Sequence, residues 1–330
     1  MPDVLLAIVS TVAALFVSEM GFRAYVFGAH AFSLEAMNGV QSMGRAGIVE
    51  RARCRGLVYS LLPNLRRSFK LVAFDTNSHG LRDREYSLKK PDNTIRVAVV
   101  GDSYTMASGV EIEEAYHSLL ERRLNENDRG RTYEFINFGT GGYGLEHYTA
   151  DLECRVEQWE PDLVLLGFSP RNDHRISPLE TFERPFDPKP REYPGRKSFA
   201  WYELSKLVGK HWTRWTDPDS QAEAEPTSEQ IAHTHRHFRA IGAWSKEHDV
   251  PVVVAYLTYR KNEPVRPEWV AEISKAYGLD FLDLSAAFRD EDRKRLRIYL
   301  TDSHPNPEAH QRFADQIYDH LLGYREFQRP

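Results

Sequence analysis

A glycine-aspartate-serine motif follows one apolar run of the chain. Residues 95–105 read IRVAVVGDSYT, and the run up to Val100 is mostly β-branched. A continuous run of this kind is typical of a buried strand in a parallel sheet, and Gly101 ends it. Ser103 therefore falls just past the carboxyl end of the strand, the edge where open α/β sheets bind ligands. A serine there is either a nucleophile or a helix N-cap, and its position alone favours the cap.

Two further groups with suitable chemistry follow later apolar runs. Residues 136–144 read INFGTGGYG, with more glycines than a tight turn needs, and glycine lets a backbone N–H approach a ligand closely. Residues 163–175 read LVLLGFSPRNDHR, which places Asn172 at the same sheet edge. An asparagine amide can donate to a developing oxyanion, although Asn-Asp after a strand more often forms a turn.

A histidine stands before the last predicted helix. Residues 299–317 read YLTDSHPNPEAHQRFADQI, with Asp302 two positions before His304. Activation of a serine needs such a pair, a histidine that takes the proton and a carboxylate that fixes its tautomer. A lone histidine before a helix is usually incidental. The acidic neighbour is what makes His304 a candidate for the base.

The elements that must position these residues alternate along the chain. From Ile95 onward, apolar runs preceded by turn residues alternate with amphipathic stretches, which predicts a parallel sheet covered by helices. We expect strands over 95–100, 133–138, 163–167, 250–257 and 280–284, and helices near 113–126, 144–159, 228–248, 267–277 and 306–322.

The four groups together resemble the blocks of the SGNH/GDSL hydrolase family, over roughly residues 76–322. The resemblance implies a nucleophile at Ser103, a base at His304 and an oxyanion hole formed by Ser103, Gly142 and Asn172. It implies a three-layer α/β/α sandwich with a mostly parallel, flavodoxin-like sheet. Asp302 would orient the base, although the usual acid lies three residues before the histidine, where this chain has Thr301. The asparagine block is also two residues longer than its short form.

We expect three parts: an N-terminal membrane anchor over 1–28, a juxtamembrane connector over 29–90 and a catalytic domain over 91–330.

Within the catalytic domain, residues 174–227 break the alternation of strands and helices with proline, aromatic and charged residues. A stretch this long without periodicity is unusual unless it is functional. Its aromatic residues, including Trp201 and Tyr202, either line a substrate groove or hold the stretch against the sheet.

The anchor is predicted from an apolar N-terminus. Residues 4–17 carry no charge, and only Glu19 and Arg23, spaced to pair on a helix, interrupt the apolar character before Phe27. About 20 such residues suffice to cross a bilayer. The absence of a basic leader and of a small-residue cleavage site favours an uncleaved anchor over a signal peptide. A buried N-terminal helix is the alternative.

The orientation of the anchor rests on two opposed arguments. Residues 45–70 are rich in arginine and lysine, which favours a cytoplasmic location, but most of these charges lie far from the apolar stretch and orient it weakly. Anchored proteins of the resembled family commonly act on envelope material. We therefore expect a periplasmic or extracytoplasmic catalytic domain.

Composition excludes several other classes of protein. The 330 residues carry a net charge of −5, which gives no reason to expect a nucleic-acid partner. Cys54 and Cys154 leave one optional bridge, and two unpaired thiols are the simpler expectation.

The HTHRH run at 233–237 is interpreted as a solvated helix face. The glycines do not match a dinucleotide fingerprint, and we expect no cofactor and no metal.

The function that the resemblance implies is a serine esterase acting on an O-acyl ester, such as an O-acetyl ester. The substrate would be an ester-bearing small molecule, a glycan or a lipid-linked compound. One alternative is an O-acyltransferase that uses the same residues. Another is a non-catalytic SGNH-like protein that binds carbohydrate or serves as a scaffold.

Overall fold

The computed structural model describes residues 2–33, 43–128, 130–176, 200, 226–260, 263–288, 293–299 and 302–327. Trp201, Tyr202 and most of the stretch 174–227 therefore lie outside the described residues.

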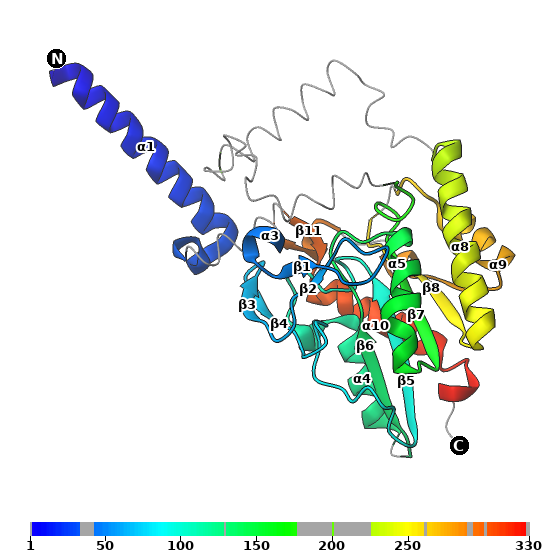
Figure 1. The fold of residues 1–330 in the computed structure, drawn as a ribbon. Coiled ribbons are helices and arrows are strands. Elements are labelled where there is room, and N and C mark those ends of the chain that lie inside the picture. The colour runs from blue at the N-terminus through cyan, green and yellow to red at the C-terminus, as the bar shows by residue number, and fades with distance from the viewer. Residues whose placement is uncertain are drawn as a thin grey trace.

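A five-stranded parallel sheet forms the centre of the fold (Figure 1). The strand order is β6-β5-β7-β8-β9, and every neighbouring pair is parallel. This is the flavodoxin-like order, so the predicted fold class is confirmed, as are all five predicted strands. Their bounds are β5 Thr94–Gly101, β6 Thr132–Asn137, β7 Leu163–Phe168, β8 Val252–Tyr256 and β9 Asp280–Asp283.

Helices cover both faces of the sheet, because side chains of each buried strand alternate between two cores. In β5, Val97 and Val99 pack with α4 and α10, whereas Ala98 and Val100 pack with α5, α8 and α9. Continuous burial along β5 explains why its sequence is apolar without alternation. The helices are α4 Tyr116–Asn127, α5 Leu145–Asp151, α8 Ser228–His248, α9 Pro267–Ala276 and α10 Pro307–Leu321.

Residues 43–90, in the stretch expected as a connector, fold against the sheet domain. They form α3 Met43–Ala46 and two antiparallel hairpins, β1 Val49–Arg51 with β2 Tyr59–Leu61 and β3 Arg66–Phe69 with β4 Val72–Asp75. Tyr59 Oη donates to the Gly141 carbonyl at 2.6 Å, and the buried Arg82 donates to the Met106 carbonyl at 2.9 Å. The segment therefore supports the glycine loop and the loop that follows Ser103.

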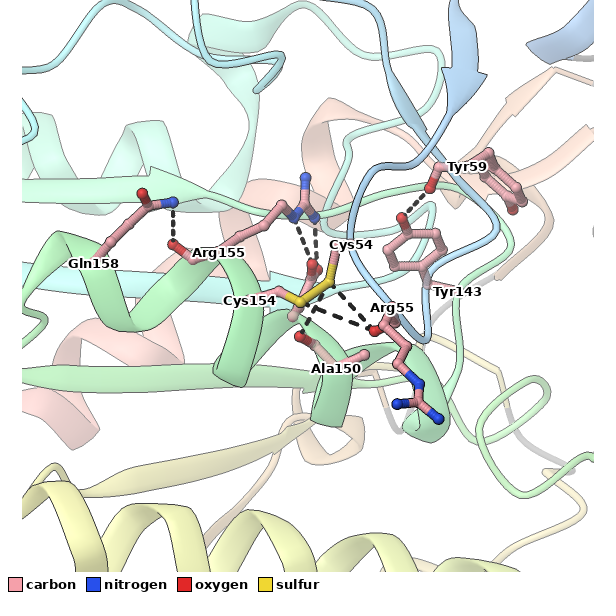
Figure 2. Close-up of a disulfide and its surroundings, with 9 residues drawn as sticks. Cys54, Arg55, Tyr59, Tyr143, Ala150, Cys154, Arg155 and Gln158 are labelled. Carbon is pink, nitrogen blue, oxygen red and sulfur yellow. Dashed lines mark hydrogen bonds and ion pairs between the residues drawn. A yellow bond between two sulfur atoms is a disulfide. The ribbon is translucent and has the colours of Figure 1, made fainter.

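A disulfide joins Cys54 to Cys154, so the expectation of two unpaired thiols is wrong (Figure 2). The residues are 100 positions apart in sequence, and their Cα atoms lie 6.1 Å apart. Leu57, three residues after Cys54, is buried in the same core as Leu152, which brings the 52–57 loop onto the short π-helix Leu152–Val156 that follows α5. This tertiary packing of the loop brings the two cysteines together.

The N-terminal helix α1, Pro2–Phe27, extends away from the sheet domain (Figure 1). The apolar side chains along its length are exposed, and Arg23 pairs with Glu19 at 2.6 Å as expected. The buried-helix alternative is therefore wrong. Residues 2–32 form a helical stretch long and apolar enough to cross a membrane, with a mean hydropathy of 2.0 over 18 consecutive residues, as an anchor or a signal sequence would be.

Candidate active site

Ser103 lies in a turn at the carboxyl end of β5. Residues 103–109 form consecutive turns, and α4 begins only at Tyr116, so the helix-cap interpretation of Ser103 is wrong. The Asp102 carboxylate accepts from Tyr104 N at 2.8 Å, and the Asp102 carbonyl accepts from Met106 N at 2.8 Å. These bonds fix the backbone on both sides of Ser103.

His304 comes from a hairpin of β10 Arg297–Tyr299 and β11 Asp302–Pro305. Its Nε2 lies 2.9 Å from Ser103 Oγ. On the other side of the ring, Nδ1 is in close contact with Asp302 Oδ1, which also accepts from His304 N at 3.0 Å. The spacing of Asp302 and His304 therefore lets one carboxylate oxygen hold both the ring and the backbone of the histidine.

Lys70, which the sequence analysis did not single out, completes this group. It stands in the β3–β4 turn, where Lys70 and Leu71 both have positive φ angles, 51° and 70°. Lys70 Nζ lies 2.7 Å from Asp302 Oδ2 and 2.9 Å from His304 Nδ1. No motif marks a lysine whose partners come from the other end of the chain.

Asp302 and Lys70 both have shifted pKa values. Burial would raise the pKa of Asp302, but the hydrogen bond from His304 and the charge of Lys70 hold it well below its usual value. Burial lowers the pKa of Lys70, an effect that the charge of Asp302 opposes. Asp302 is therefore ionised at and around neutral pH.

The two remaining predicted residues face the same cavity as Ser103. Gly142 has φ of 82°, and a Cβ placed on it would lie 2.6 Å from Tyr59 Oη, so only glycine fits. Asn172 Nδ2 donates to Asp102 Oδ2 at 2.6 Å. An amide nitrogen carries two hydrogens, so this bond orients Asn172 and leaves its second hydrogen for another acceptor.

Two buried carboxylates hold the loops beneath the cavity. Burial raises the pKa of Asp102, against the hydrogen bonds from Tyr104 N and Asn172. Burial also raises the pKa of Asp173, which accepts from Ser169 N at 2.6 Å and from Tyr148 Oη at 3.0 Å. Asp173 thereby shapes the turn that carries Asn172, a role that no sequence motif indicates.

The cavity has a volume of about 550 Å³ and is bordered by cationic side chains. Lys70, Arg171, Arg175 and Arg260 line it together with Ser103, the 141–144 loop and His304. Arg171 pairs with Glu263 at 2.9 Å. None of the side chains lining the cavity in the described part of the chain is acidic, which favours negative charge within it.

The fold is a three-layer α/β/α sandwich, with its cavity at the carboxyl edge of a parallel sheet. The chain belongs to the GDSL-like lipase/acylhydrolase family, whose model matches residues 99–312. The predicted family is therefore confirmed, and the matched domain is that of an ester hydrolase. Comparison with curated proteins finds no match.

Among solved structures, the chain is similar to a two-domain esterase active on acetylated mannans, with 14% identity and a TM-score of 0.45. That alignment covers 70% of this chain and 49% of the esterase, so the chain spans about half of the esterase's length. It is also similar to an acetylxylan esterase from Geobacillus stearothermophilus, with 15% identity, a TM-score of 0.43 and coverage of 72% and 95%.

Proposed function

We propose that the chain is a serine esterase in which Ser103 is the nucleophile and His304 the general base. The observation that carries the proposal is the continuous contact from Ser103 Oγ to His304 Nε2, at 2.9 Å, and from His304 Nδ1 to Asp302. The Asp302 carboxylate accepts the Nδ1 proton, which leaves the Nε2 lone pair directed at the serine hydroxyl. His304 takes that proton as Oγ attacks the acyl carbon.

The negative charge of the tetrahedral intermediate falls in a region rich in donors. We assign its stabilisation to the N–H groups of Ser103 and Gly142 and to the second Nδ2 hydrogen of Asn172. Groups fixed in advance need no reorganisation during the reaction, which is why such donors accelerate it. His304 then returns its proton to the leaving alkoxide, and the acid remains esterified to Ser103.

The fate of the acyl-enzyme separates two versions of the function. If water attacks the acyl carbon, with His304 again taking the proton, the enzyme is an esterase. If a hydroxyl group of a glycan attacks instead, the same residues perform O-acyl transfer. The non-catalytic alternative is disfavoured, because a binding module has no need of a serine, a histidine and a carboxylate in this order of contact.

We propose that the substrate is an O-acyl ester presented close to a membrane, on the extracytoplasmic side. The ring of Phe27, the last residue of α1, lies 5.6 Å from that of Tyr299, in the hairpin that carries His304. An anchor joined there would hold the cavity near the lipid surface. The disulfide supports export, because such bonds persist in oxidising compartments.

Hydrolysis of p-nitrophenyl acetate by the full chain in detergent tests this function. We expect turnover by the natural chain and a loss of several orders of magnitude in Ser103→Ala, with an unchanged circular dichroism spectrum. More than about a tenth of the natural activity in Ser103→Ala would exclude this serine as the nucleophile. Adding a free oligosaccharide to the assay distinguishes transfer from hydrolysis, since transfer to one of its hydroxyl groups lowers the acetate released per p-nitrophenol.

A further inference from the structure

A second cluster of polar side chains lies between α5 and α8, which pack side by side on one face of the sheet (Figure 1). Glu146 belongs to the first turn of α5, and His233 and His237 lie one turn apart on α8. One ligand atom from each of the three falls within 4.8 Å of the others. The interpretation of the HTHRH run as a solvated helix face is wrong for His233, which is only 6% exposed.

Two buried polar atoms of this cluster face each other as a long ion pair. His233 Nε2 and Glu146 Oε2 are both inaccessible to solvent, and within the described part of the chain neither makes a hydrogen bond of good geometry with another group. They are 3.3 Å apart. Two ligands at about 2.0–2.1 Å from a tetrahedral ion are separated by about 3.3–3.4 Å, so an ion seated between these atoms would satisfy both.

The third side chain is held in the form that binds metals. His237 Nδ1 lies 3.0 Å from Thr149 Oγ1, whose only hydrogen is donated to the Leu145 carbonyl at 2.9 Å. Thr149 Oγ1 is therefore the acceptor, and His237 Nδ1 carries the ring proton. The lone pair is left on Nε2, and fixing the other ring nitrogen in this way is typical of histidines that ligate metals.

We infer that Glu146, His233 and His237 form a binding site for a divalent transition metal, with Zn²⁺ the ion that best suits two imidazoles and one carboxylate. Imidazole ligands disfavour Ca²⁺ and Mg²⁺, which prefer oxygen. Three protein ligands leave one position for water. The neighbouring His147 is not a ligand in this arrangement. Its Nδ1 accepts from Gly144 N at 3.2 Å, so the lone pair is already used and, unlike in His237, the ring proton lies on Nε2.

The site would stabilise the loop that borders the cavity. Gly144 lines that cavity and directly precedes α5, so Glu146 lies two residues from it. An ion bound by both helices would fix the start of α5 against α8, and with it the 141–144 loop. The ion would therefore act on the cavity through the position of this loop, and it takes no part in the acyl transfer proposed for Ser103.

The inference is tested by adding zinc chloride to the full chain in detergent, purified without a histidine tag and treated with a chelator. We expect one tightly bound zinc ion per chain and a rise in the melting temperature on zinc addition. Glu146→Gln and His237→Ala should fold, as judged by circular dichroism, and bind zinc at least about tenfold more weakly. His235→Ala is the matched control, because His235 belongs to the same run but contacts Tyr277 Oη, 3.1 Å away.

Two results would overturn the inference. One is a natural chain that binds no zinc. The other is a His235→Ala variant that loses as much zinc affinity as His237→Ala while Glu146→Gln loses none. Ser103→Ala should bind zinc like the natural chain, so a failure of the proposed catalytic role and a failure of the metal site give different results.

Discussion

The spacing of Asp302 and His304 determines how the base is held. The sequence places the carboxylate two positions before the histidine, and in the fold Asp302 Oδ1 contacts both the ring and the backbone of His304. The second oxygen, Oδ2, accepts from Lys70 at 2.7 Å. The short spacing is therefore compatible with orientation of the ring, and Lys70 supplies an additional support for the carboxylate.

The contributions of the histidine and the carboxylate should differ. His304→Ala removes the proton acceptor, whereas Asp302→Asn removes only the group that orients it. We expect the loss of kcat/KM on p-nitrophenyl acetate to be about 10- to 100-fold larger for His304→Ala. An equal or greater loss in a correctly folded Asp302→Asn variant would contradict this ranking.

Replacing Lys70 should change the pH dependence of stability. Because the pKa of Asp302 is lowered in the folded protein, the stability it contributes is complete above the ordinary aspartate pKa of about 3.9 and is lost as pH falls below it. Lys70→Met removes a charge that lowers this pKa. Urea unfolding measures the free energy of unfolding of both proteins. The difference in this free energy between Lys70→Met and the natural chain should be largest near neutral pH and should shrink below about pH 4.

Lys70→Arg is the control for that measurement, since it retains the positive charge. We expect this variant to keep most of the pH-dependent part of the stability. A difference between Lys70→Met and the natural chain that stays constant over the whole pH range would show that Lys70 acts through packing alone.

At the scale of elements, the carboxyl ends of β5, β6 and β7 bring the serine, the glycine loop and the asparagine to one edge. The β1–β2 hairpin supports this edge from outside, because Tyr59 Oη donates to the Gly141 carbonyl at 2.6 Å. This contact leaves no space for a side chain on Gly142. The position of the Gly142 N–H thus depends on a segment outside the sheet.

Gly142→Ala should therefore impair catalysis. The new methyl group would displace Tyr59 or the loop and move one oxyanion donor, and loss of such a donor typically costs about 10²- to 10³-fold in kcat. Gly278→Ala is a matched control, because Gly278 also has positive φ, 73°, but open space around it. We expect Gly278→Ala to lose stability and retain kcat on p-nitrophenyl acetate, and equal loss of kcat in both variants would contradict the assignment.

Sequence reasoning succeeds where the signal is local and fails where it depends on tertiary packing. Continuous apolar runs marked all five sheet strands, and strand ends placed Ser103, Gly142 and Asn172 at one edge. Neither Lys70 nor the disulfide carries a local signal, since each depends on how residues 43–90 fold onto the domain. The HTHRH run predicts a solvated face from the pattern of a single helix, whereas His233 is buried in the fold, where α8 packs against α5.

At the scale of the whole molecule, the exposed helix α1 and the disulfide Cys54–Cys154 bear on the same question, the compartment of the sheet domain. The basic residues at 45–70 argue for the cytoplasm on sequence grounds. The bridge argues for an oxidising compartment, because cytosolic thiols are kept reduced. We give the bridge more weight, since most of the basic residues lie too far from α1 to orient it strongly.

A fusion of alkaline phosphatase after Ser33 should be active, because that enzyme requires export. The native chain, isolated from membranes without reductant, should also resist thiol alkylation at Cys54 and Cys154. An inactive fusion that accumulates to normal levels, together with two alkylated cysteines, would place the domain in the cytoplasm.

The most direct measurement of the central claim is reaction of the full chain with a fluorophosphonate, followed by mass spectrometry of the labelled peptide. An activated serine attacks the phosphorus and expels fluoride, so we expect one adduct per chain, located on Ser103. The adduct should be lost in Ser103→Ala and strongly slowed in His304→Ala. An adduct on another residue, or none at all in a preparation that hydrolyses p-nitrophenyl acetate, would contradict the assignment of Ser103 as the nucleophile.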